Sequence, residues 1–206
     1  MIKADSTARF GLIRHAETLW NLEKRIQGHC DSPLTDAGRQ AAEIWGKTLL
    51  PSHWSRILSS DAGRARQTAE IMNSFLKLPC SIDHRLREQN WGRWTAKTIA
   101  QIQADCPDEL GAQINAGWNF CPPEGERRLE VWDRSRRALI EAADRWPGAT
   151  ILVVTHEGVL KSLIYRLSGR EFLPSEAPLI NSAYLHWLVI DHNDLYLEEV
   201  NAIRLA

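Results

Sequence analysis

The hydrophobic positions of this chain form short apolar runs that alternate with longer segments of helical periodicity. Apolar runs of strand length precede Arg14, Ser59 and Thr155, and a shorter run lies at 81–83. Helical patterns cover 35–50, a segment beginning near Asp61, 124–146, and the segment after His156. The last two apolar runs, 183–190 and 195–200, flank a turn-rich sequence and predict a hairpin. This alternation predicts an α/β fold, a three-layer α/β/α sandwich around a mostly parallel sheet.

Polar and turn-forming residues mark the expected ends of these helices. Thr35 and Asp61 are expected to cap the helices that follow them, because their side-chain oxygens can accept hydrogen bonds from free backbone N–H groups. Pro147 and Gly148 are expected to stop the long helix over 124–146, and Gly169 to end the last helix.

The segment 84–123 departs from the alternation. It holds Trp91, Trp94, Trp118 and Phe120, and its pattern predicts at most one short helix, near 95–104. A long connection in a compact domain is often a functional cap, although the aromatic side chains could instead form a small core of the cap itself. Because no repeat or linker is visible, we expect one domain over 1–206 that carries this cap.

Composition and charge narrow the functional classes. With 206 residues, 44% of them hydrophobic, the chain can bury a substantial core, and a formal net charge of -1 gives no global field for nucleic acid or anionic membranes. The four cysteines lack zinc-ligand spacing and form no disulfide framework. The first nine residues lack an apolar signal region, and no apolar stretch reaches membrane-spanning length. We therefore expect a cytoplasmic protein without nucleic-acid or membrane partners, and its oligomeric state stays open.

Two of the predicted strands deliver histidines to the same kind of position. Arg14 and His15 follow the first apolar run, and His156 follows the run over 150–154. Open α/β sheets bind their ligands at the carboxyl ends of the strands. The sequence therefore predicts a pocket there for an anion, with a histidine nucleophile.

These residue types suit phosphoryl transfer, which needs a positioned nucleophile, cations around the phosphate oxygens and an acid for the leaving oxygen. His15 could attack through an unprotonated imidazole nitrogen, while Arg14 and Arg64 hold the phosphate with paired hydrogen bonds. Arg64 also falls in the first turn of its predicted helix, where free N–H groups favour an anion.

Three further residues could complete such a site. A protonated His156 and the neutral Asn21 would add hydrogen-bond donors, and Glu88 could protonate the leaving oxygen and then deprotonate water. Each has a plain alternative: a histidine at a strand end is often structural, an arginine often makes a surface ion pair, and Glu88 could be solvated. Their joint occurrence at strand ends and a helix start favours the pocket.

Ordered motifs along nearly the whole chain resemble the histidine phosphatase superfamily, in its phosphoglycerate-mutase-like branch. They lie at 12–18, 20–21, 25–28, 31–35, 59–69, 86–88 and 153–159. The resemblance implies a covalent phosphohistidine at His15, a phosphate pocket of Arg14, Arg64 and His156, and Glu88 as the acid. It also implies no metal or other cofactor, with the matched residues Gln27 and Gly28 contacting the substrate.

Three positions differ from the family's usual motifs: Ala16 and Glu157 replace glycine, and Thr95-Ala96 stands where Glu-Gly is common. Ala16 could narrow the approach to the backbone or restrict its conformation. The Thr95-Ala96 pair leaves the contacts near the cap open. Glu157 could either favour a protonated His156 or repel the substrate.

The segment between the acid motif and the long helix is shorter than in the family's mutases. This favours hydrolysis of a small phosphomonoester, such as α-ribazole phosphate or a sugar phosphate. Two alternatives stay open: a phosphotransferase of the phosphoglycerate mutase type, and a binding protein that keeps the phosphate pocket but has little activity. The latter is supported only by Ala16 and Glu157.

Overall fold

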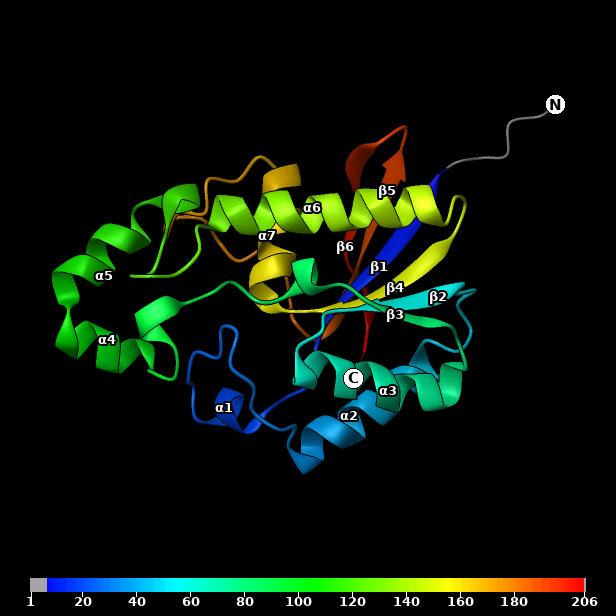
Figure 1. Ribbon diagram of the computed structural model, residues 1–206, viewed down its shortest axis with the longest axis horizontal. Helices are drawn as coiled ribbons and strands as arrows, with labels where there is room; N and C mark the ends of the chain where they lie inside the picture. Colours follow the sequence, from blue (N-terminus) through cyan, green and yellow to red (C-terminus); the bar gives the residue numbers. More distant parts are fainter. Residues whose placement is uncertain (1–6, 206) are drawn as a thin grey trace.

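A mixed sheet forms the centre of the structure (Figure 1), and the computed structural model describes residues 7–205. Within that range the sheet has six strands in the order β3-β2-β4-β1-β5-β6. The strands are β1 (Ala8–Arg14), β2 (Arg56–Ser59), β3 (Cys80–Ile82), β4 (Thr150–Thr155), β5 (Tyr184–Asp191) and β6 (Asp194–Arg204). The first four pair in parallel, and the β5-β6 hairpin joins antiparallel to β1.

The two central strands explain how the histidines come together. Strands β1 and β4 are buried along most of their length and rich in β-branched and other apolar residues, as expected for strands covered on both faces. They pair in register, with Ile13 opposite Val154 and Arg14 opposite Thr155. The ladder continues by one bond, in which the His15 N–H donates to the Thr155 carbonyl over 2.9 Å. Both strands therefore end at the same edge of the sheet.

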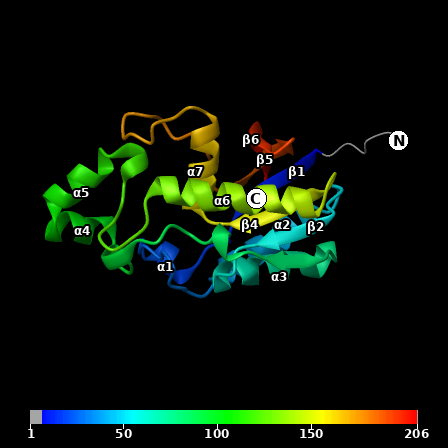
Figure 2. The same cartoon turned by 45° about the horizontal axis from the view of Figure 1, so that its top comes forward.

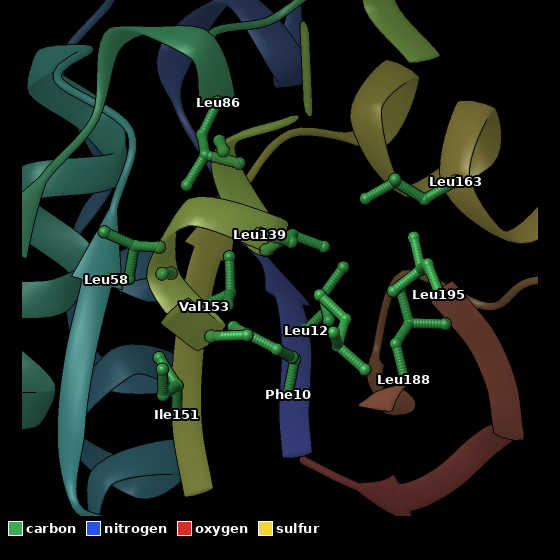
Figure 3. Close-up of a cluster of buried hydrophobic side chains, with 14 of the residues drawn as sticks. Phe10, Leu12, Leu58, Leu86, Leu139, Ile151, Val153, Leu163, Leu188 and Leu195 are labelled. Carbon is green, nitrogen blue, oxygen red and sulfur yellow. The ribbon is translucent and has the colours of Figure 1, made fainter. Parts of the chain in front are cut away.

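Helices cover both faces of this sheet, which confirms the three-layer α/β fold (Figure 2). Helices α6 (Arg128–Arg145) and α7 (Glu157–Leu167) pack on one face, where a core forms around Phe10, Leu12 and Val153 (Figure 3). Helices α2 (Asp36–Thr48) and α3 (Gly63–Leu76) cover the other face over a second core. The short helix α1 (Leu19–Leu22) lies in the loop that follows β1.

One predicted helix cap is confirmed and the other is wrong. Thr35 caps α2, its hydroxyl accepting from the Gly38 N–H over 2.8 Å. Asp61 does not cap α3; its carboxylate pairs with Arg87, and Ala62 occupies the cap position without a side-chain bond. The first N–H of α3 instead donates to the Asp31 carboxylate over 2.6 Å, because a loop distant in sequence packs against this helix end.

The long helix begins later than its periodicity suggests. It starts at Arg128 rather than at 124, and it ends at Arg145. Residues 122–125 form a turn in which the Gly125 N–H donates to the Pro122 carbonyl over 2.8 Å, and Glu124 has a φ of +59°. This left-handed backbone is incompatible with a helix.

The cap contains more helix than the sequence predicts. Between 84 and 123 lie α4 (Ile99–Asp105), α5 (Pro107–Ile114) and three 3₁₀ turns, η1 (His84–Leu86), η2 (Gly92–Trp94) and η3 (Gly117–Asn119). The expectation of at most one short helix near 95–104 is therefore wrong. A capping box of Thr98 with Gln101 starts α4, and Pro107 opens α5.

A small hydrophobic core of its own holds this cap together. Trp94, Ile102, Leu110 and Phe120 are buried in it, separately from the two cores on the sheet. Trp118 packs elsewhere, edge-on against Phe172 with 5.0 Å between ring centroids. The alternative interpretation of the cap aromatics, a local core, holds for Trp94 and Phe120.

Of the helices in residues 7–205, none is long and apolar enough to cross a membrane. The four cysteines, Cys30, Cys80, Cys106 and Cys121, are free thiols.

Candidate active site

The predicted strand-end residues meet in one pocket at the carboxyl edge of the sheet. His15 directly follows β1 and His156 directly follows β4, and their ring centroids lie 5.2 Å apart. The pocket has a volume of about 410 Å³. Its lining includes Arg14, His15, Asn21, Gln27, Gly28, Arg64 and Glu88. His156 is buried beside it.

The hydrogen bonds of His15 define which ring nitrogen is available for reaction. Its Nδ1 lies 2.8 Å from the Ala16 carbonyl, and its Nε2 lies 3.2 Å from Nε of Arg64. Because an arginine can only donate, Nε2 is the acceptor and Nδ1 carries the proton, an assignment made from the network. Burial, then the charges of Arg14 and Arg64, lower the pKa of His15 well below its ordinary value. The ring is therefore neutral at physiological pH, with a lone pair on Nε2.

Arg64 is the most rigidly held cation of the site. Its side chain is almost fully buried, and it donates from Nη1 to the Cys30 carbonyl (2.7 Å) and to Oδ1 of Asp31 (2.8 Å). Its Nη2 donates to the Gly28 carbonyl over 2.9 Å. Gly28 has a φ of +51°, which suits glycine, so it positions the arginine in addition to lining the pocket.

Arg14 is paired with the unusual Glu157. Its Nη1 lies 2.8 Å from Oε2 of Glu157, and the other carboxylate oxygen lies 2.6 Å from Nζ of Lys161. Burial alone would raise the pKa of Glu157, but the charges of Arg14 and Lys161 outweigh burial and lower it. Glu157 therefore stays ionised and neutralises Arg14. Within residues 7–205, the Nε of Arg14 is buried without a hydrogen-bond partner.

His156 is held by a residue that the sequence analysis missed. Its Nε2 lies 2.8 Å from the hydroxyl of Ser60, the buried residue that directly follows β2, and its Nδ1 finds no partner among the described residues. Burial, followed by the charge of Arg64, lowers the pKa of His156 well below its ordinary value. This ring is therefore neutral at physiological pH. The position of Ser60 at a strand end was the signal available in the sequence.

Glu88 lines the pocket and rests on the start of α7. Its Oε1 accepts from the N–H groups of Gln89 (2.8 Å) and Gly158 (3.1 Å). A Cβ atom at residue 158 would lie 2.2 Å from the same oxygen, so the carboxylate position requires glycine there. The Glu88 carbonyl accepts from Nη2 of Arg134 over 3.1 Å. Arg134, in mid-helix outside every motif, was also missed.

Asn21 and Gln27 line the pocket as expected, and both are organised around Thr18. The Asn21 Oδ1 accepts from the Thr18 N–H over 3.0 Å in the capping box of α1, which leaves its amide N–H groups unused among the described residues. The Gln27 amide donates to the Thr18 hydroxyl over 2.8 Å, and its Oε1 is buried without a partner in that range.

The substitution at Ala16 affects packing rather than the pocket. The Ala16 methyl is fully buried in the core beneath α2 and α3, and Ala16 does not line the pocket. Its N–H donates to the hydroxyl of Thr68 over 3.0 Å. The expected narrowing beside the nucleophile is therefore not observed.

Several residues from outside the motifs complete the pocket wall. They include Trp91 and Ile99 from the cap, Arg128 at the start of α6, Lys161 on α7, and Phe172 from the connection between α7 and β5. Across residues 7–205, no group of three or more His, Cys, Asp or Glu side chains is arranged to hold a metal ion.

Comparisons with known proteins identify the family of this chain. The family model of the histidine phosphatase superfamily (branch 1) matches residues 10–203. A Yersinia pestis protein named "Probable phosphoglycerate mutase GpmB" is 35% identical over 166 residues, covering 81% of this chain and 76% of that protein.

Solved structures give the same result. YhfR of Bacillus stearothermophilus is 34% identical with a TM-score of 0.86, covering 96% of this chain and 98% of its own. The alpha-ribazole phosphatase from Shigella flexneri is 27% identical with a TM-score of 0.79, covering 94% of this chain and 96% of its own. The motif resemblance is thereby confirmed, and the chain belongs to the histidine phosphatase superfamily, in the branch of phosphoglycerate-mutase-like enzymes that act as phosphatases or mutases.

Proposed function

We propose that this protein hydrolyses the phosphomonoester of a small metabolite through a phosphohistidine at His15, without a metal. The observation that carries the proposal is the contact between Nε2 of His15 and Nε of Arg64 at 3.2 Å. At this contact the Nε2 lone pair of His15 points toward the Arg64 guanidinium. A phosphoryl group bound by Arg64 would meet that lone pair, as nucleophilic catalysis requires.

The reaction would proceed in two balanced steps. First, Nε2 of His15 attacks phosphorus, the bond to the ester oxygen breaks, and Glu88 as carboxylic acid protonates the departing alcohol. The resulting Glu88 carboxylate then takes a proton from water while that water attacks phosphorus and the phosphorus–nitrogen bond breaks. Inorganic phosphate leaves and neutral His15 is restored.

Charges of the pocket support the phosphoryl group in both steps. Arg14 and Arg64 would hold the phosphate oxygens through guanidinium hydrogen bonds, and a bound phosphate dianion beside His156 would favour protonation of that ring. Burial is the first cause that lowers the pKa of His156 and the neighbouring cations are the next, and the charge of the dianion opposes the effect of those cations.

The substrate is proposed as a small phosphorylated metabolite such as α-ribazole phosphate or a sugar phosphate. The relative named as an alpha-ribazole phosphatase supports a phosphatase. The relative named as a phosphoglycerate mutase favours the second candidate, in which the phosphohistidine passes its phosphoryl group to another hydroxyl. Incubation with 3-phosphoglycerate separates the two, because a hydrolase releases inorganic phosphate whereas a mutase forms the 2-phospho isomer.

Trapping the intermediate tests the proposed chemistry directly. We expect an alkaline quench during turnover of 4-nitrophenyl phosphate, followed by intact-protein mass spectrometry, to show one added phosphoryl group. The label should be absent from His15→Ala, and turnover should persist after thorough chelation. Label retained by that variant, or activity abolished by chelation and restored by a divalent ion, would show the mechanism to be wrong. A protein that binds phosphate but shows neither label nor turnover would be the weakly active binding protein.

A further inference from the structure

Arg128 is held at the wall of the pocket in an unusual setting. It is the first residue of α6, and its guanidinium carbon lies 4.2 Å from the ring centroids of both Phe120 and Phe172. Phe172 belongs to the connection between α7 and β5, which reaches toward the cap on the side where α6 begins (Figure 2). The two rings engage the π-faces of the guanidinium, so further polar partners must approach in its plane.

One edge of the guanidinium is used and the other is not. Nη1 donates to the carbonyls of Gly117 (3.1 Å) and Phe172 (3.3 Å), which fixes the side chain. Nε and Nη2 form no hydrogen bond with any described residue, and neither is a buried atom cut off from solvent. These two donors form the fork that binds a carboxylate or phosphate through two parallel hydrogen bonds.

The charge of Arg128 is also uncompensated. Other arginines of the pocket have carboxylate partners: Arg14 pairs with Glu157, Arg25 with Glu23, and Arg64 with Asp31. Within residues 7–205, no carboxylate forms an ion pair with Arg128. Burial lowers its pKa to about 10, which leaves it protonated at neutral pH. A half-buried cation without a counter-charge is unfavourable, and an anionic ligand would relieve it.

We propose that Arg128 binds a second anionic group of the substrate, a carboxylate or another phosphate, carried on the alcohol part of the phosphomonoester. The inference rests on the proposed function and narrows its substrate class to phosphorylated hydroxy acids or bisphosphates. Ile99, Trp91 and Phe172 line the same pocket and suit the carbon chain between the two anionic groups. Arg128 is then a specificity-determining residue, because it contacts the substrate away from the reacting phosphorus.

Matched substrate pairs test this role. We would compare ω-carboxyalkyl phosphates of increasing chain length with the corresponding carboxamides, which have the same shape and leaving group but no second charge. Bisphosphates of the same diols form a third arm and distinguish a carboxylate from a phosphate site. At the optimal length we expect kcat/KM to be about 10- to 100-fold higher for an anionic member than for the amide, mainly through KM.

Substitutions then assign the preference to Arg128. Arg128→Met should reduce the ratio of anionic to amide substrates to near one, and Arg128→Lys should retain part of it. The control is Arg127→Met, which removes an equal charge from the adjacent exposed residue outside the pocket and should keep the ratio. If Arg128 only fastens Gly117 to Phe172, Arg128→Met will weaken both members of each pair equally, and the inference is wrong.

Failure of the inference and failure of the proposed function give different results. Turnover of 4-nitrophenyl phosphate and of both members of each pair, without any preference in the wild-type protein, would overturn the role of Arg128 and leave the hydrolase intact. If no ester is hydrolysed, the proposed function fails. Calorimetric binding of the same pairs to the wild-type protein, Arg128→Met and Arg127→Met still decides the role of Arg128, since binding requires no turnover.

Discussion

A single methyl group at residue 158 should separate activity from stability in this protein. Gly158 is the second residue of α7, and its N–H donates to the Glu88 carboxylate. The Cβ of Gly158→Ala would lie 2.2 Å from Oε1 of Glu88 and 3.2 Å from its Cδ. Ordinary contacts to a Cβ atom lie between 3.4 and 4 Å, so the carboxylate must move by more than about 1 Å.

That movement should be costly for catalysis and nearly neutral for folding. A displacement of about 1 Å at a catalytic group can lower the rate ~10²-fold, and loss of general acid help costs ~10²–10⁴-fold. Gly158 has an ordinary φ, so alanine adds about 0.5–1 kcal/mol of helix propensity, which offsets the loss of one hydrogen bond of similar size. We expect Tm to change by no more than about 2 °C.

The assay compares single-turnover rates for an alkyl phosphate and 4-nitrophenyl phosphate. The alkyl ester leaves as a strongly basic alkoxide and needs the proton from Glu88, whereas nitrophenolate needs it much less. Gly158→Ala should therefore slow the alkyl ester far more than the aryl ester, as should Glu88→Gln. The double variant should be no slower than Glu88→Gln alone, because both changes remove the same function.

A matched control is available at Gly111. A Cβ atom added there, in α5, meets nothing within 4 Å, so Gly111→Ala should gain helix propensity and keep full activity. If Gly158→Ala keeps the alkyl phosphate rate within about threefold of wild type, the placement of Glu88 by α7 has no catalytic meaning. Equal losses for both leaving groups would instead assign Glu88 an electrostatic or structural role.

The remaining predictions concern charge. Glu157→Gln releases Arg14 and removes a negative charge beside the phosphate, so we expect inorganic phosphate to inhibit about fivefold more strongly; an unchanged or weaker inhibition constant would contradict this. In the folded protein, burial is the main cause that lowers the pKa of His15, His156 and His186, and the pKa of His186 falls to about 4. The contribution of these rings to stability is therefore complete above the unfolded pKa of about 6.5 and is lost as the pH falls. Urea unfolding between pH 7.5 and 5 should show the free energy of unfolding decreasing with falling pH, by up to about 1.4 kcal/mol per pH unit for each ring. His186→Asn, which keeps an acceptor for the Asn201 N–H, should make this slope shallower, and an unaltered slope would refute the assignment.

The part of the candidate site that could be predicted from the sequence is the part that lies at strand ends. His15 and His156 follow apolar runs whose buried strands pair in register, so the periodicity that predicts the sheet also predicts their meeting. Asp61 shows where this reasoning stops. Asp61 precedes a helix as a capping residue would, but its carboxylate pairs with Arg87. The first N–H of the helix donates instead to the carboxylate of Asp31, which lies in a loop distant in sequence. A local pattern does not contain the contacts that compete for a side chain.

The cap was predicted least well for a related reason. Its helices α4 and α5 are short and lack a long apolar stripe, so they depend on the small core around Trp94 and Phe120 rather than on periodicity. Arg134 and Ser60 each reach the candidate site through a contact with a residue distant in sequence: Arg134 with the Glu88 carbonyl, and Ser60 with His156.

Arg128 marks the limit of sequence reasoning most clearly. In the sequence it is one of two adjacent arginines at a helix start, and nothing separates it from the exposed Arg127. Its significance lies in its surroundings: two rings on its faces, two carbonyls on one edge, and no carboxylate among the described residues. The strand-end motifs can be shared by proteins with different substrates, because they bind only the phosphoryl group. Selection of the substrate must then depend on side chains such as Arg128 that reach the pocket from outside those motifs, and these are visible only once the chain is folded.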